Sequence, residues 1–169
     1  MLAGGHPNSL GRTLEVVDAV LADRSRLEDL YRCYFSGDEV VRLRVSSAMK
    51  RITIEHPDWT IDFIDGLQSE IAAIDQASTQ WTLALLFDLM ADRLSPRQRS
   101  RSIEIMQDNL AHQSDWIVLN NSMKVLGKWA QADPGLAEWL LPHARRLAGD
   151  DRKSVAGNAG KLLDQLSSR

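Results

Sequence analysis

The chain has 169 residues, of which 44% are hydrophobic and 25% charged, and its formal net charge is −3. This balance is typical of one globular domain with its own core and excludes the intrinsically disordered class. No run of about 18 apolar residues is present, which excludes a membrane-spanning helix. The single cysteine, Cys33, excludes an intramolecular disulfide and a cysteine-based zinc site, as expected for a cytoplasmic protein.

The chain begins with a segment, residues 1–11, that is rich in glycine and proline. Because these residues interrupt regular structure, we expect a flexible lead-in, and it lacks the basic start and apolar run of a signal peptide. Residues 12–169 are expected to form a single domain. Its first amphipathic segment, about residues 13–21, predicts a helix that caps the rest of the fold.

An internal repeat organises the remainder of the chain. Val41 is followed by apolar residues four, eight and eleven positions later, a spacing that places them on one face of a helix. The same spacing starts again at Thr79, Val118 and Val155, and repeats of this length are typical of stacked helix pairs. The predicted core residues are Val41, Val45, Met49, Ile52, Thr79, Leu83, Phe87, Met90, Val118, Ser122, Leu126, Trp129, Val155, Ala159, Leu163 and Leu166.

Another amphipathic helix precedes each of these second helices. The predicted first helices cover residues 25–35, residues 58–74 with Asp58 as N-cap, a segment opened by Ser95-Pro96 and a segment opened by Asp133-Pro134. A capping side chain followed by proline is a typical helix start. No stretch alternates with the period of two typical of a strand. The sequence therefore predicts an all-α fold, a right-handed stack of helix pairs.

The segment Asp38-x-x-Val41-Arg42-x-x-Val45-x-x-x-Met49-x-x-Ile52 resembles the second-helix signature of HEAT repeats. The third copy keeps Asp115 and Val118 but has Leu119 in place of the Arg, and the copies at Thr79 and Val155 depart further. The resemblance covers about residues 24–167. It implies an α-α superhelix, a right-handed solenoid of about four HEAT-like helix pairs with an N-terminal capping helix. HEAT and armadillo arrays mostly bind proteins on a concave surface formed by the second helices.

The outward positions of the second helices are the candidate binding surface. Rotation of about 100° per residue points positions 43, 44, 47 and 50, with their equivalents in the other copies, away from the core. An Asn side chain donates and accepts hydrogen bonds, so a row of them beside an exposed Trp81 can pair with an extended peptide backbone, similar to armadillo arrays. The predicted partner-binding residues are Arg44, Trp81, Asn120, Asn121, Lys124, Asn158 and Lys161. The alternative is that Trp81 packs between helices and the Asn side chains bond their own turns.

Histidines and arginines suggest two further kinds of site. His56 and His112 each precede an Asp at a predicted turn, but no two histidines are three or four residues apart, and turn capping accounts for both, so no metal is expected. Arginines cluster at 93–101 and 145–153. They are interpreted as solvated helix faces, because the concave surface carries only scattered cations and nucleic-acid binding requires a basic face.

No catalytic motif is present: the chain has no glycine-rich phosphate loop, Gly-x-Ser-x-Gly elbow or His-Glu-x-x-His segment. The prediction is a non-enzymatic, cytoplasmic scaffold without a cofactor, which binds an unknown protein or extended peptide and no membrane. One alternative is a nucleic-acid-binding or DNA-repair protein similar to the HEAT-like alkylpurine DNA glycosylases. The other is a homo-oligomerisation module that pairs the open ends of the array.

Overall fold

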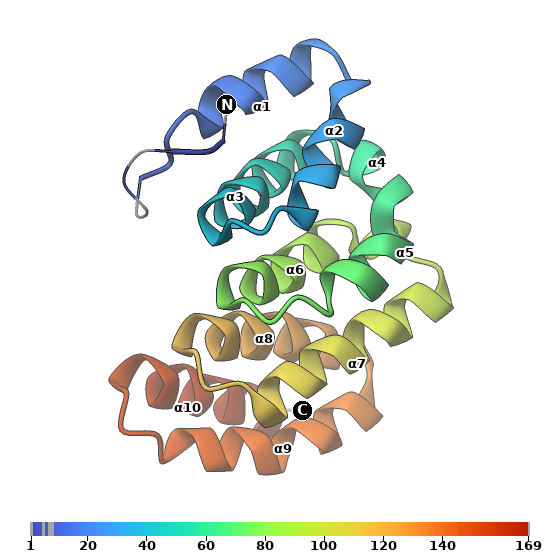
Figure 1. The fold of residues 1–169 in the computed structure, drawn as a ribbon. Helices are drawn as coiled ribbons and strands as arrows, with labels where there is room; N and C mark the ends of the chain where they lie inside the picture. The colour runs from blue at the N-terminus through green and yellow to red at the C-terminus, as the bar shows by residue number, and fades with distance from the viewer. Residues whose placement is uncertain (1, 5, 7–8, 169) are drawn as a thin grey trace. The chain divides into compact units, whose positions relative to one another are not determined.

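The computed structural model describes residues 2–4, 6 and 9–168, and these residues form helices and turns without a strand (Figure 1). The all-α prediction is confirmed. The chain divides into two compact units, Met1–Arg99 (unit 1) and Ser100–Arg169 (unit 2). Within the described part of the chain, no helix is both long and apolar enough to cross a membrane.

Unit 1 is organised around α3 (Glu39–Glu55), which packs against α1 (Thr13–Ala22) and α6 (Ala77–Leu89) (Figure 1). The start of α3 is fixed by Asp38, whose carboxylate accepts hydrogen bonds from two main-chain N–H groups of the first turn at 2.8 and 3.4 Å. This N-cap satisfies donors that have no partner inside the helix. The helix predicted over residues 13–21 is present as α1.

The first helices of unit 1 are shorter and less regular than predicted. They consist of α2 (Arg26–Arg32), the 3-10 turn Cys33–Phe35, α4 (Pro57–Thr60), the 3-10 turn Ile61–Phe63, α5 (Ile64–Gly66) and the π-helical turn Leu67–Ile71. The prediction of Asp58 as an N-cap is wrong. Pro57 occupies the first helical position and His56 is the cap residue, because proline has no N–H and loses nothing there.

Unit 2 contains α8 (Trp116–Trp129), α9 (Pro134–Ala148) and α10 (Lys153–Ser167), and α10 packs against both of the others. Asp133 accepts the Leu136 N–H at 3.0 Å and so caps α9 as predicted. The predicted start at Ser95-Pro96 is also present, since α7 (Pro96–His112) begins there and runs into unit 2.

The core positions of the repeat are buried in all four second helices. The helices α3, α6, α8 and α10 each begin two residues before the first predicted core position. Every predicted core side chain is buried except Leu163, and Leu162 is buried in its place. In α3, α6 and α8 the residues seven and eight positions after the first core residue are both buried, so the difference at Leu163 is confined to α10.

Gly66 provides a test of packing in unit 1. A Cβ atom at this position would lie 2.2 Å from the hydroxyl oxygen of Tyr31, whose ring packs against Phe35 and Phe63. Gly66→Ala should therefore lower the free energy of unfolding by about 1–3 kcal/mol. In α10, a Cβ atom at Gly157 would meet open space. Gly157→Ala should therefore raise the free energy of unfolding by about 0.5–1 kcal/mol. Urea denaturation followed by circular dichroism measures both, and equal effects would contradict this packing.

Candidate functional site

The candidate site of unit 2 lies between the second helices α8 and α10. A glycine allows them to approach closely, because a Cβ at Gly127 would lie 2.7 Å from Cδ1 of Leu162. The side chain of Gln165 also reaches across and donates from Nε2 to the Gly127 carbonyl at 3.4 Å. Close packing at the floor leaves the outward side chains of both helices facing one groove.

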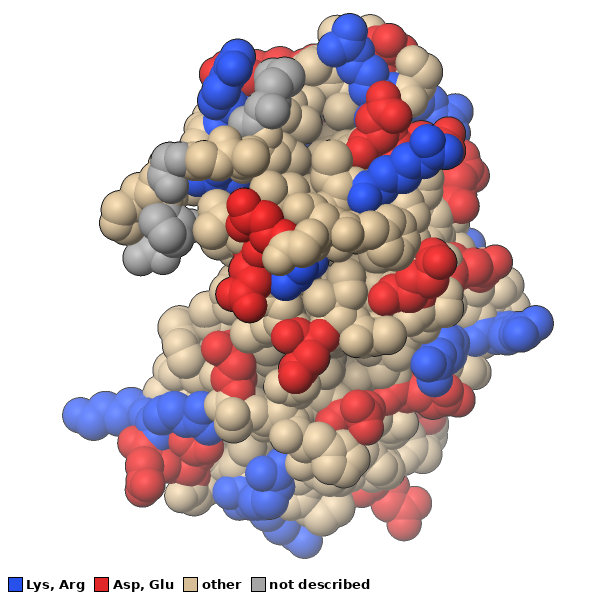
Figure 2. Space-filling model, in the orientation of Figure 1, with Lys and Arg blue, Asp and Glu red and all other residues tan. Residues whose placement is uncertain are grey.

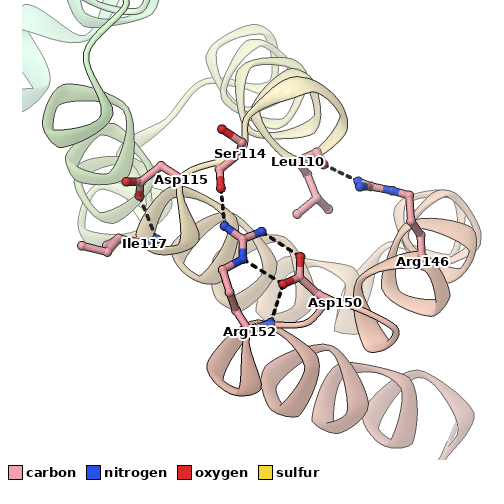
Figure 3. A network of polar contacts seen from close by, with 7 residues as sticks. All are labelled: Leu110, Ser114, Asp115, Ile117, Arg146, Asp150 and Arg152. Carbon is pink, nitrogen blue, oxygen red and sulfur yellow. Dashed lines mark hydrogen bonds and ion pairs between the residues drawn. The ribbon is translucent and has the colours of Figure 1, made fainter.

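A polar network fixes the start of α10 (Figure 3). Arg152 donates from Nε and Nη2 to the two carboxylate oxygens of Asp150, at 2.8 and 2.7 Å, and its Nη1 donates to the Ser114 carbonyl. Asp115, which follows Ser114 in the sequence, caps α8: its carboxylate accepts a hydrogen bond from the Ile117 N–H at 2.8 Å. The same arginine therefore ties the beginning of α10 to the beginning of α8, and so positions the two walls of the groove.

The groove encloses about 350 Å³. Its lining combines amide side chains, lysines and a small apolar floor: Asn120, Asn121, Met123, Lys124, Lys128, Asn158, Lys161, Leu162 and Gln165. Five of the predicted partner-binding residues meet here, namely Asn120, Asn121, Lys124, Asn158 and Lys161. The prediction missed Lys128 and Gln165, although each lies four residues after a predicted lysine, the spacing of neighbours on one helix face.

The groove is positively charged. Lys124 and Lys161 are exposed and form no ion pair with any residue that the structure describes, and no carboxylate is among the lining residues. Lys128 also lines the groove, but unlike these two lysines it has a partner within the described chain. Uncompensated lysines around a concave surface attract an anionic ligand and raise its rate of association.

The amides of the groove have unused hydrogen-bonding capacity. The Oδ1 atom of Asn120 is inaccessible to solvent and accepts no hydrogen bond within the described chain. The half-buried Asn158 likewise makes no hydrogen bond to a described residue, whereas Asn121 already has a partner. A buried acceptor without a donor costs about 1–3 kcal/mol. Because Oδ1 of Asn120 is closed to solvent, only the Nδ2 group of this side chain is left to bond a ligand.

The other two predicted residues, Arg44 and Trp81, lie in unit 1. They line a groove of about 240 Å³ between α3 and α6, together with Lys50 and the lead-in residues Ser9 and Leu10. Trp81 is half-buried and has a partner within the described chain. Trp81 is therefore only partly open to solvent, which falls short of the exposed platform that was predicted.

The prediction that Arg44 faces solvent is wrong. Its side chain is only 1% exposed, because the lead-in folds over it and four main-chain carbonyl groups accept hydrogen bonds from its guanidinium. We predicted that residues 1–11 are flexible. Residues 1, 5, 7 and 8 of this segment lie outside the described residues, so the prediction stays untested for them. The described lead-in residues cover Arg44, and no periodic pattern in the sequence signals such a contact.

The histidines do not assemble a metal site in the described chain, where no group of three metal-ligating side chains occurs. His56 stacks on Trp59 with ring centroids 3.8 Å apart, and its Nδ1 atom lies 3.9 Å from the Asp58 carboxylate. His112 contacts the Asp108 carboxylate at 2.9 Å rather than the Asp that follows it in sequence. Each histidine thus has a local partner on its own helix or turn.

The arginine clusters predicted to be solvated faces are partly engaged in structural contacts. Arg146 donates to the Leu110 carbonyl at 2.8 Å and Arg101 pairs with Glu104 at 3.0 Å. On the face shown in Figure 2, basic side chains are interspersed with acidic ones in each unit. A nucleic-acid footprint requires cations gathered on one face, and this face does not provide one.

Comparison with known proteins adds no relative: no family model, no curated protein and no solved structure matches the chain.

The Asp150–Arg152 pair predicts an acid-sensitive component of stability. The hydrogen bond from Arg152 is the largest cause that lowers the pKa of Asp150 from 3.8 to about 2. The contribution of this carboxylate is therefore complete above about pH 4 and is lost as the pH falls toward 2. The difference in unfolding free energy between wild type and Asp150→Asn should shrink over this window in chemical denaturation. Asp151→Asn, which removes a neighbouring carboxylate without a hydrogen bond to described residues, is the control, and an equal pH dependence in both variants would refute the assignment.

Proposed function

We propose that the chain is a protein-interaction scaffold built from HEAT-like helix pairs, and that unit 2 binds an extended acidic segment of a partner protein between α8 and α10. The observation that carries the proposal is the composition of this groove. Two unpaired lysines, Lys124 and Lys161, flank amide side chains, and no carboxylate lines the surface. Lysines attract carboxylates, and amides bond both the N–H and the C=O groups of an extended main chain.

The repeat itself supports this use of the second helices. Arg44 and Asn121 occupy equivalent positions of two copies, displaced by the same interval as Val41 and Val118. In unit 1 this position binds main-chain carbonyl groups of a non-helical segment, which is the lead-in. The equivalent position of unit 2 lies in a groove that no part of the described chain fills. The HEAT-like superhelix is part of the same proposal. It is supported by the nearly even spacing, along the sequence, of the four second helices.

Nucleic acid is a less suitable ligand for this groove. Single-stranded nucleic acids bind by stacking their bases on aromatic side chains beside a basic track. The lining contains cations but no aromatic residue. Specific contact with an acidic peptide needs only the lysines and amides that are present.

The proposal predicts charge-dependent binding of an acidic peptide. A labelled peptide of five Glu-Ser repeats should bind the full chain, and fluorescence anisotropy measures its affinity. Lys124→Glu with Lys161→Glu should weaken binding by about tenfold or more, since two attractive pairs of about 0.2–1 kcal/mol become repulsive. Moderate salt should weaken binding to the wild type, because it screens exposed charges.

The matched control is Arg145→Glu with Lys153→Glu, which makes the same change of net charge at two exposed residues of unit 2 outside the groove lining. This variant should keep most of the affinity. Equal losses in both double variants, or no binding by the wild type, would reject the groove. Tighter binding of a single-stranded oligonucleotide of equal charge would favour the nucleic-acid alternative.

A second test concerns the amides. Asn120→Ala with Asn158→Ala should weaken binding of the same peptide by about fivefold per lost hydrogen bond of about 1 kcal/mol, with little change in its salt dependence. Asn109→Ala, a buried amide of α7 outside the groove, is the control for general effects of amide removal and should leave the affinity unchanged after correction for any loss of folded protein. An unchanged affinity in the Asn120/Asn158 variant would show that the amides do not contact the peptide.

A further inference from the structure

The lead-in of the chain is held on unit 1 by one arginine. Arg44 donates from Nη1 to the carbonyl oxygens of Leu2 and Gly4, both at 2.5 Å, and from Nη2 to that of His6 at 3.2 Å. Its Nε donates to the Ser9 carbonyl at 3.1 Å. Four of the five N–H donors of the guanidinium are thus used on the main chain of a single non-helical segment.

The turn at the end of the lead-in fits closely against the same side chain. Gly11 has a φ of +52°, and a Cβ at this position would lie 2.8 Å from Cζ of Arg44. A side chain at residue 11 would both strain the backbone and collide with the guanidinium of Arg44. Glycine therefore permits the chain to return to α1 while it wraps the arginine.

An apolar contact provides a second point of attachment. Leu2 is buried and lies at a pocket of about 470 Å³ lined by Val16, Val20, Leu30 and Val41. Burial of this leucine side chain removes apolar surface from water and so stabilises the attachment. Cys33, the only cysteine of the chain, lines the same pocket.

The contact of Arg44 with the lead-in differs from an ordinary buried ion pair. All hydrogen bonds of this arginine within the described chain go to neutral carbonyl groups, and none goes to a carboxylate. When the lead-in departs, water can solvate the guanidinium, and no buried counter-charge remains. Separation therefore avoids the penalty that follows the breaking of a buried ion pair.

We propose that Arg44 and the apolar pocket at Leu2 form a polypeptide-binding site of unit 1, which the chain fills with its own lead-in as a displaceable ligand. The ligand class is a non-helical segment with one aliphatic anchor followed by glycine-containing main chain whose carbonyl groups converge on the guanidinium. A segment of this chemistry supplied from another molecule replaces the lead-in. The proposal is independent of the groove of unit 2.

The reactivity of Cys33 in the full chain tests whether the lead-in is displaceable. Leu2→Ala and Arg44→Gln should each increase the rate of maleimide labelling under native conditions several-fold, because each releases one of the two attachments above the pocket. Lys50→Gln removes a charge from the same helix at a residue that makes no hydrogen bond to a described lead-in carbonyl, and it should label at the wild-type rate. Circular dichroism establishes that all variants are folded.

Binding in trans tests the site itself. A variant without residues 2–10 should label rapidly at Cys33, and a synthetic peptide of residues 1–11 should restore protection in a saturable manner. The same variant with Arg44→Gln should need at least tenfold more peptide. If the shortened protein does not fold, the peptide is added to full-length Leu2→Ala instead, where it should also slow labelling.

Two results would overturn the proposal. One is equal labelling of wild type, Leu2→Ala and Arg44→Gln, which would show that the lead-in does not cover the pocket. The other is peptide protection that is absent or does not depend on Arg44, which would show that the lead-in has only a structural role in its own chain.

Discussion

Each second helix carries one apolar face, and the burial of that face is the constraint on which the rest of the structure depends. In unit 1 the face of α3 is covered by α1 and α6, and in unit 2 α10 is covered by α8 and α9. Because the core uses only one face, the opposite residues are free to differ between copies. The same frame therefore holds an arginine in one copy, Arg44, and an asparagine in another, Asn121, and it gives the two units grooves of different chemistry.

Local signals in the sequence were sufficient for the second helices and most helix starts. The spacing of apolar residues depends only on helix geometry, and caps such as Asp38 and Asp133 act within one turn. The irregular segment 57–71 could not be predicted in this way. In this segment Gly66 lies close to the hydroxyl group of Tyr31, and these two residues are far apart in sequence. The exchange of Leu163 for Leu162 is a smaller error, which concerns α10 alone.

The functional surface was predictable to the extent that it follows helix rotation. Five predicted residues share the α8/α10 groove, and the missed Lys128 and Gln165 extend the same faces by one turn. Arg44 was assigned to an open surface because rotation of α3 points it outward. Helix rotation determines exposure only for an isolated helix, and here the lead-in lies over the outward face of α3 at Arg44. Hydrogen bonds from a guanidinium to carbonyl groups leave no pattern of residue types in the sequence, so only the structure reveals this contact.

The central claim is that the groove between α8 and α10 receives an extended acidic segment. The most direct measurement is a nuclear magnetic resonance titration of isotope-labelled full-length protein with the Glu-Ser peptide, in which side-chain amide resonances are followed one by one. The account predicts saturable shifts of the Asn120, Asn121 and Asn158 amides with one common affinity, together with main-chain shifts along the lysine-bearing turns of both helices. Shifts that gather elsewhere, or that increase linearly without saturation, would contradict it.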